Sequence, residues 1–214
     1  NKEETFAIVG HTRSGKSLII NIFMKYYEYN QGEILIDNQS IKEIPKNDLK
    51  HNIGLVLQDA FIFYGTITSN IKLYHPTMTF EKAREAAEFV NADQFINKLP
   101  GKYDHQVIEK GSAFSSGERQ LLAFARTIAS DPKILILDEA TANIDSETEA
   151  QIQLSLEKMR KGRTTLAIAH RLSTIQDADQ ILVLNKGEIV ERGTHDELIK
   201  ENGIYHKMYL LQNG

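Results

Sequence analysis

The run Gly10–Ser17, G-H-T-R-S-G-K-S, fits the pattern G-x-x-x-x-G-K-[ST] at every specified position. The apolar run Thr5–Val9 precedes it and is expected to form a buried parallel strand, and Leu18–Tyr27 follows it and is expected to form a helix. A strand, this loop and a helix in that order constrain the chain to an α/β fold. The arrangement also predicts a nucleoside triphosphate as the ligand.

Each part of this loop has a chemical reason to be there. Its glycines let the backbone curl so that successive N–H groups point at a phosphate, and the helix N-terminus adds a positive dipole end. Lys16 is expected to meet the β- and γ-phosphates, and the Ser17 hydroxyl to coordinate Mg²⁺. A glycine-rich turn with a chance Lys-Ser is the disfavoured alternative. We therefore expect nucleotide contacts from Gly10, His11, Thr12, Arg13, Ser14, Gly15, Lys16 and Ser17.

Composition excludes several other classes. The 214 residues carry a formal net charge of −4, so electrostatics do not imply nucleic acid. The absence of cysteine excludes a disulfide framework and a thiolate metal site, which favours a reducing compartment such as the cytoplasm. No apolar stretch reaches the ~18 residues that a membrane span needs. Because the chain begins at Asn1 without an initiator Met, we expect it to be part of a longer protein.

Strand-like and helix-like segments alternate along the chain, which predicts a mainly parallel sheet flanked by helices. The turn Asn185–Gly187 predicts that the last two strands form an antiparallel hairpin. Besides Thr5–Val9, the expected strands are Gly32–Asp37, Ile53–Leu57, Ile134–Leu137, Thr164–Ile168, Gln180–Leu184 and Glu188–Glu191.

A helical stretch interrupts this alternation between Thr66 and Lys98. Its apolar residues recur at helical spacing, while Glu81–Glu88 is rich in charges that pair on a solvated face. The stretch closes at Leu99–Gly101, so we expect a helical insert in the sheet.

The buried strand Ile134–Leu137 runs directly into two carboxylates, Asp138 and Glu139. Parallel strands of this kind end at the ligand-bearing edge of a sheet. Asp138 is expected to hold Mg²⁺, and Glu139, pointing the other way, to polarise the attacking water. Acidic residues also cap helices, so the assignment depends on the pairing with Gly10–Ser17.

The run Phe114–Gln120, F-S-S-G-E-R-Q, resembles the signature L-S-G-G-Q-R-Q of the ABC (ATP-binding cassette) ATPases. Gln58 matches the family's Q-loop, Asn143–Asp145 its D-loop and His170 its H-loop. The alternatives are a solvated amide at Gln58 and a structural histidine at position 170. The resemblance covers essentially the whole chain and is strongest to the nucleotide-binding domain of a bacterial ABC exporter half-transporter.

The resemblance implies a fold, a division of the chain into two parts, and further residues before Asn1. It implies a P-loop NTPase (RecA-like) core over residues 1–65 and 129–214, with an inserted α-helical subdomain over residues 66–128 that carries the signature. It also implies that short antiparallel strands and an adenine-stacking aromatic residue precede Asn1. We therefore expect weak nucleotide binding and little ATPase activity from residues 1–214 alone.

The resemblance further implies that two such domains meet head to tail, each ATP lying between one P-loop and the other domain's signature. It assigns catalysis to Glu139, His170, Lys16 and Gln58, and Mg²⁺ to Ser17, Gln58 and Asp138. It assigns contacts with the partner's nucleotide to Ser115, Ser116, Gly117, Glu118 and Asp145. ATP hydrolysis then powers export through a transmembrane domain of the same polypeptide, from the cytoplasmic face of the cell membrane.

Two positions depart from the family pattern. Ser116 replaces the first signature glycine, where a Cβ crowds the approach of a phosphate, and Glu118 replaces a glutamine, where a carboxylate repels it. We therefore predict that the chain works opposite a different subunit.

A soluble ABC-type ATPase of DNA repair or of translation is the alternative. Repair ATPases carry long coiled-coil insertions between P-loop and signature, whereas Gln58–Ser115 is compact and lacks sustained heptads. Translation factors normally join two cassettes in one chain. Neither fits this sequence well.

Overall fold

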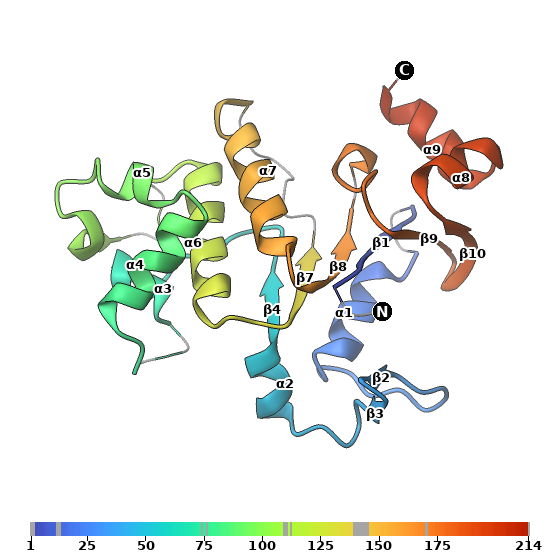
Figure 1. Cartoon of the computed structure of the whole chain (residues 1–214), viewed down its shortest axis with the longest axis horizontal. Helices are drawn as coiled ribbons and strands as arrows, with labels where there is room; N and C mark the ends of the chain where they lie inside the picture. Colours follow the sequence, from blue (N-terminus) through green and yellow to red (C-terminus); the bar gives the residue numbers. More distant parts are fainter. Residues whose placement is uncertain are drawn as a thin grey trace.

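The computed structural model describes residues 3–11, 14–73, 75, 77–108, 111, 113–138, 146–169 and 171–213. Its centre is a six-stranded sheet in the order β10-β9-β1-β8-β7-β4 (Figure 1). The strands are β1 (Thr5–Val9), β4 (Ile53–Val56), β7 (Ile134–Asp138), β8 (Thr164–Ile168), β9 (Gln180–Asn185) and β10 (Glu188–Gly193). Neighbouring strands are parallel except β9 and β10, which confirms the mainly parallel sheet and its terminal hairpin.

Alternating side chains place the two faces of the sheet in different cores. Ile8 and Ile136 pack on the face covered by α1 (Lys16–Phe23) and α2 (Lys46–Asn52). Their neighbours Ala7 and Leu137 belong to the larger core on the opposite face, with α6 (Ser116–Ala129) and α7 (Ser146–Arg160). Both faces are covered, as a parallel sheet requires.

The predicted helical stretch is confirmed. It contains α3 (Ile67–Ile71), α4 (Phe80–Phe89) and α5 (Asp93–Ile96), which lie with α6 beyond the β4 edge of the sheet (Figure 1). Ala83 and Ala87 of α4 are fully buried, whereas Arg84 and Glu88 form a half-exposed ion pair of 3.5 Å. The 3-10 helix η1 (Lys102–Asp104) follows, and β5 (Gly65–Thr66) pairs antiparallel with β6 (Gln106–Val107).

The C-terminal elements lie at the other end of the molecule, beside β9 and β10 (Figure 1). They are α8 (His195–Lys200) and α9 (Ile204–Asn213); the 3-10 helix η3 (Leu172–Thr174) lies between β8 and β9 in the chain. The Glu191 carboxylate accepts hydrogen bonds from the N–H groups of Ile204 and Tyr205 and so caps α9. None of the helices in the described part of the chain is long and apolar enough to cross a bilayer.

Two expected elements differ from the structure by more than two residues, while the ends of the other expected strands agree within two residues. Gly32–Asp37 is not a strand of the main sheet: only β2 (Leu35–Ile36) forms there, and it pairs with β3 (Gln39–Ser40) in a separate ribbon. Asp37 and Asn38 both have positive φ, 48° and 65°, so the chain reverses in a tight turn. The first helix ends at Phe23 rather than Tyr27, because Lys25 takes a φ of 53°.

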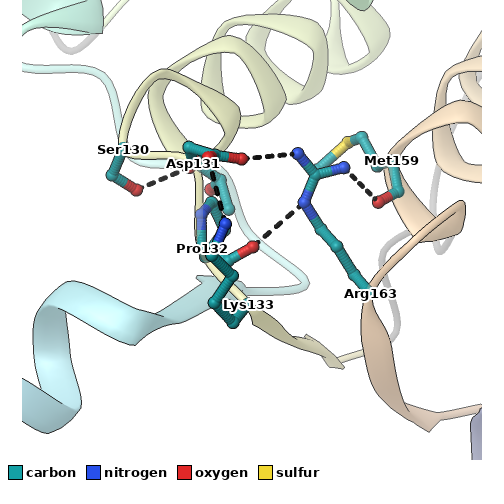
Figure 2. Close-up of polar contacts among 7 residues, drawn as sticks. Ser130, Asp131, Pro132, Lys133, Met159 and Arg163 are labelled. Atoms are coloured by element: carbon teal, nitrogen blue, oxygen red, sulfur yellow. Dashed lines mark hydrogen bonds and ion pairs between the residues drawn. The ribbon is translucent and has the colours of Figure 1, made fainter. Parts of the chain in front are cut away.

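Arg163 lies at the edge of the sheet where β7 and β8 begin. Its guanidinium donates to the Pro132 carbonyl at 3.0 Å, to the Met159 carbonyl at 3.1 Å and to the Asp131 carboxylate at 3.0 Å (Figure 2). Hydrogen bonds from Lys133 and Arg163 lower the pKa of Asp131. The end of α7 and the starts of β7 and β8 are thereby held together.

Candidate nucleotide-binding site

The carboxyl ends of β1, β8, β7 and β4 lie in that order along one edge of the sheet. The loop Gly10–Ser17 follows β1, Asp138 ends β7, and Gln58 lies two residues beyond β4. In the register, Ile168 of β8 lies beside both Ile8 of β1 and Asp138 of β7. The structure therefore brings these sequence-predicted residues to one edge.

Lys16 begins α1 and points back into its own loop. Its side chain is buried, and its ammonium donates to the carbonyl oxygens of Gly10 at 2.7 Å and His11 at 3.2 Å. A buried ammonium is tolerated because it is paired. The charge thus already lies within the loop that the sequence assigns to phosphates.

The loop around Lys16 is tight where a phosphate would need a close approach. A Cβ at Gly10 would collide with the Leu184 carbonyl oxygen and lie 2.9 Å from the Ser14 hydroxyl. Gly15 takes the left-handed φ of 105° just before α1, and the Gly187 N–H donates to the Ser14 carbonyl at 3.0 Å. The hairpin of β9 and β10 therefore supports the loop from one side.

The described residues fit a triphosphate and a divalent cation. The Ser14 hydroxyl is buried and has no hydrogen-bond partner within the described part of the chain. The Ser17 hydroxyl lies in the first turn of α1, Asp138 is partly buried and Gln58 is exposed. Hydroxyl, carboxylate and amide oxygens are the donors that Mg²⁺ prefers.

The signature forms the start of α6, with Ser115 as its N-cap. The Glu118 N–H donates to the Ser115 hydroxyl at 3.1 Å, and the Ser115 N–H donates to the Glu118 carboxylate at 2.9 Å. This is a capping box. From the sequence, Glu118 was expected to contact the partner's nucleotide and to repel phosphate; the capping role was not expected, although the S-x-x-E spacing signals it.

The signature lies on the far side of the sheet from the P-loop of its own chain. Gln120 and Thr127 of α6 donate side-chain hydrogen bonds of 3.5 Å to the carbonyls of Leu57 and Leu55. Two strands, β7 and β8, separate β4 from β1. Three strand spacings amount to roughly 14 Å, so α6 and Lys16 approach different parts of the edge.

Five predicted site residues lie outside the residues that the structure describes: Thr12, Arg13, Glu139, Asp145 and His170. The described chain ends beside them at Asp138, Ala169 and Arg171, and α7 begins at Ser146.

A cavity of about 550 Å³ opens beside Gln58. Leu57, Asp59 and Phe63 line it, together with Phe61, which is 49% exposed. Arg126 of α6 donates to the Phe61 carbonyl at 3.0 Å and lies 5.4 Å from the centre of the Phe63 ring. This cavity was not predictable from local sequence patterns, because its walls come from four separate stretches of the chain, within residues 24–26, 47–63, 75 and 123–130.

Comparison with known proteins places the chain in a family. The family described as "ABC transporter" matches residues 1–142, so the chain belongs to the ABC transporter family. Within it, the phosphate loop, the mainly parallel sheet and the helical stretch define an ATP-binding cassette, which is an ATP-hydrolysing domain.

Individual relatives of the chain are also named as ABC transporter proteins. An ABC transporter ATP-binding protein of Streptococcus pneumoniae, exp8, is 62% identical over 214 residues, covering 100% of this chain and 36% of the relative. YheH of Bacillus subtilis, named for multidrug resistance and as an ATP-binding/permease protein, is 55% identical over 100% of this chain and 32% of its own. The chain therefore spans about a third of the length of these relatives.

A solved structure shows the same fold. A bacterial Atm1-family ABC exporter with ATP bound aligns with a TM-score of 0.92 and 38% sequence identity, covering 100% of this chain and 37% of the exporter chain. The expected fold class and the membership in the ABC transporter family are confirmed.

Proposed function

We propose that the chain is the motor domain of an ABC exporter, in which ATP hydrolysis drives a substrate across a membrane. The observation that carries this proposal is the convergence of the Lys16 loop, Asp138 and Gln58 at one edge of the sheet. Relatives named as exporters or as ATP-binding/permease proteins support the transport role. They disfavour the alternative of a soluble ATPase of DNA repair or translation.

In this proposal the P-loop residues 10–17 bind the phosphates of ATP, with Lys16 transferring its hydrogen bonds from loop carbonyls to phosphate oxygens. Ser17, Gln58 and Asp138 would hold Mg²⁺, which supplies positive charge beside the phosphates. Glu139, directly after Asp138, orients and deprotonates the attacking water. His170, after β8, contacts the γ-phosphate.

The second nucleotide contact comes from another cassette, arranged head to tail. The placement of α6 supports this, because its side chains bond to the β4 end of the sheet while the Lys16 loop follows β1, three strands away. Ser115, Ser116 and Gly117 present the N-terminus of α6 to the partner's ATP, with Asp145 at the same contact.

Ser116 favours a partner subunit that differs from this chain. Its side chain occupies space that the first glycine of the family signature leaves open for a phosphate. The capping role of Glu118 shows a use for that carboxylate on its own helix, so the asymmetry is assigned to Ser116. Ser116→Gly in the full-length protein should raise ATP turnover at the site that this signature completes. Unchanged turnover at both sites would argue against a specialised pair.

Residues 66–128 act as the subdomain that passes the motion on, between the core segments 1–65 and 129–214. Arg126 ties this subdomain together, donating to the Asn70 carbonyl at 2.9 Å. We place the transmembrane domain of the same polypeptide against the cavity beside Gln58, at the cytoplasmic face. The exposed side chains of Leu57 and Phe61, which line the cavity, supply apolar area there.

The test uses the full-length protein in lipid vesicles. Lys16→Ala should abolish both ATPase activity and transport, while Lys207→Ala, at an exposed lysine of α9, should change neither. Phe61→Arg, in the cavity wall, should leave ATP binding intact but uncouple hydrolysis from transport. Full ATPase activity in Lys16→Ala would contradict the proposed function.

A further inference from the structure

The first turn of α7 touches two parts of the chain that the proposed function assigns to two different ATP molecules. Thr148 contacts the signature at Gly117, and the next residue, Glu149, contacts Arg171. The signature serves the partner's ATP, whereas Arg171 directly follows His170, which serves the chain's own ATP. One helical turn therefore lies between the two sites.

The contact with the signature is steric. A Cβ added to Gly117 would collide with the Thr148 hydroxyl oxygen and lie 2.7 Å from its Cβ. Gly117 is itself buried at the start of α6. The glycine thus permits close packing of α6 on α7, and any displacement of Thr148 must be accompanied by a displacement of the signature turn.

The contact on the other side is an ion pair. The Arg171 guanidinium donates to the Glu149 carboxylate at 2.6 Å, with both side chains partly exposed. The next residue is held independently, because the Leu172 N–H donates to the Gln212 side-chain oxygen of α9 at 2.8 Å. The segment that follows His170 is therefore tied to α7 on one side and to α9 on the other.

Further along α7, two polar side chains join it to the helical stretch. The Ser155 hydroxyl donates to the Val90 carbonyl at 2.7 Å, and the Gln151 amide donates to the Asn91 carbonyl at 3.0 Å. Both acceptors directly follow α4, which ends at Phe89. A shift of the helical stretch is consequently transmitted along α7 to its first turn.

We propose that Thr148 and Glu149 are positioning residues that couple the signature of one ATP site to the His170 segment of the other. The inference rests on the proposed pairing of two cassettes. Neither residue needs to contact nucleotide: Thr148 acts through Gly117 and Glu149 through Arg171. Their loss should therefore reduce kcat while leaving KM for ATP nearly unchanged.

The ion pair is tested by charge exchange in the full-length transporter. Glu149→Arg should lower kcat about tenfold, with KM changed less than twofold, because a small misplacement of a catalytic segment has effects of this size. The double variant Glu149→Arg/Arg171→Glu should recover kcat to within about threefold of the original. Glu88→Arg, which breaks the exposed pair of α4, is the matched control and should have no effect.

The steric contact is tested by exchanging volume. Gly117→Ala should lose turnover, and Gly117→Ala/Thr148→Gly should regain at least a third of it, on the order of the recovery expected for a direct pair. If the glycine served only the approach of a phosphate, the double variant would remain inactive. That result, or an unchanged kcat in Glu149→Arg, would overturn the inference.

Two further measurements distinguish a misfolded variant from a failure of the proposed coupling or of the proposed function. Thermal unfolding identifies a variant that does not fold, and Glu149→Ala, which removes the acceptor for Arg171 without adding a second positive charge, then replaces Glu149→Arg and should also lower kcat. Lys16→Ala measured in parallel tests the proposed function itself. Loss of activity in Lys16→Ala together with full activity in the α7 variants would reject only the coupling.

Discussion

The ammonium of Lys16 lies 2.7 Å from the carbonyl oxygen of Gly10, at the other end of the same loop. This hydrogen bond holds a buried positive charge where the loop closes on itself. An arriving phosphate offers that charge a stronger, charge-assisted partner. The loop is therefore prepared for an anion before any anion binds.

The loop encloses a compact ammonium and not a planar guanidinium, so a positive charge of another shape at position 16 should not support ATP hydrolysis. We expect Lys16→Arg to retain less than about 1% of ATPase activity, since Arg and Lys differ in shape and hydration. Isothermal titration of the full-length protein with ATP would show weakened binding in Lys16→Arg. Equal affinity and turnover in Lys16→Arg would contradict the tight fit of the loop.

The capping box gives Glu118 a role that does not depend on its negative charge. Glu118→Gln should retain ATPase activity within about twofold, because a side-chain amide oxygen can still accept from the Ser115 N–H. Glu118→Ala removes the acceptor and should cost about 1 kcal/mol of stability. Denaturant unfolding and ATPase assays measure both. Higher turnover in Glu118→Ala would show that the carboxylate acts mainly by repelling phosphate.

His75 should make folding sensitive to mild acid. Burial lowers its pKa below 6.5, with smaller effects from His51 and Lys82. The unfolded chain therefore takes up a proton as the pH falls through 6.5 while the folded chain resists it, so stability decreases below that pH. The difference in unfolding midpoint between pH 7.5 and 5.5 should shrink in His75→Gln. An unchanged difference would assign the acid sensitivity to other groups.

Arg163 should contribute to the stability of the fold and not to ATP hydrolysis. Its side chain is only 15% exposed and donates to Pro132, Met159 and Asp131 at the sheet edge remote from Lys16 (Figure 2). Arg163→Ala leaves two carbonyl groups without this donor and should cost roughly 2–4 kcal/mol. Lys133→Ala, which removes only an exposed partner of Asp131, should cost less than about 1 kcal/mol. Equal losses, measured by denaturant unfolding, would contradict this account of Arg163.

The parts of the fold that local pattern determines were predictable from the sequence. Thr164–Ile168 and Ile134–Leu137 are short apolar runs with clear ends, and each forms a strand of the sheet. The motif Gly10–Ser17 predicts the ligand class. Gly32–Asp37 failed as a strand of the main sheet because Asp37 and Asn38, at positive φ, turn the chain back on itself. The apolar residues of this run favour a strand, but they do not indicate which strand it pairs with.

The parts of the candidate site that depend on distant contacts were not predictable. Nothing near Gly117 in the sequence indicates that Thr148 limits the space beside it, and the cavity beside Gln58 needs α2, β4 and α6 together. The capping role of Glu118, by contrast, is encoded locally in the S-x-x-E spacing from Ser115. The same residues match a nucleotide-contacting signature, so one short run of sequence supports both roles.

We infer that Lys16 and Ser115 of one chain serve two different ATP molecules. Photolabelling of this chain with azido-ATP, together with the ATPase rate of the assembled transporter, tests it directly. Lys16→Ala should lose both labelling and turnover, whereas Ser115→Arg should keep labelling of its own P-loop and lose turnover. Equal loss of labelling in the two variants would place the signature and the P-loop on the same nucleotide and contradict the account.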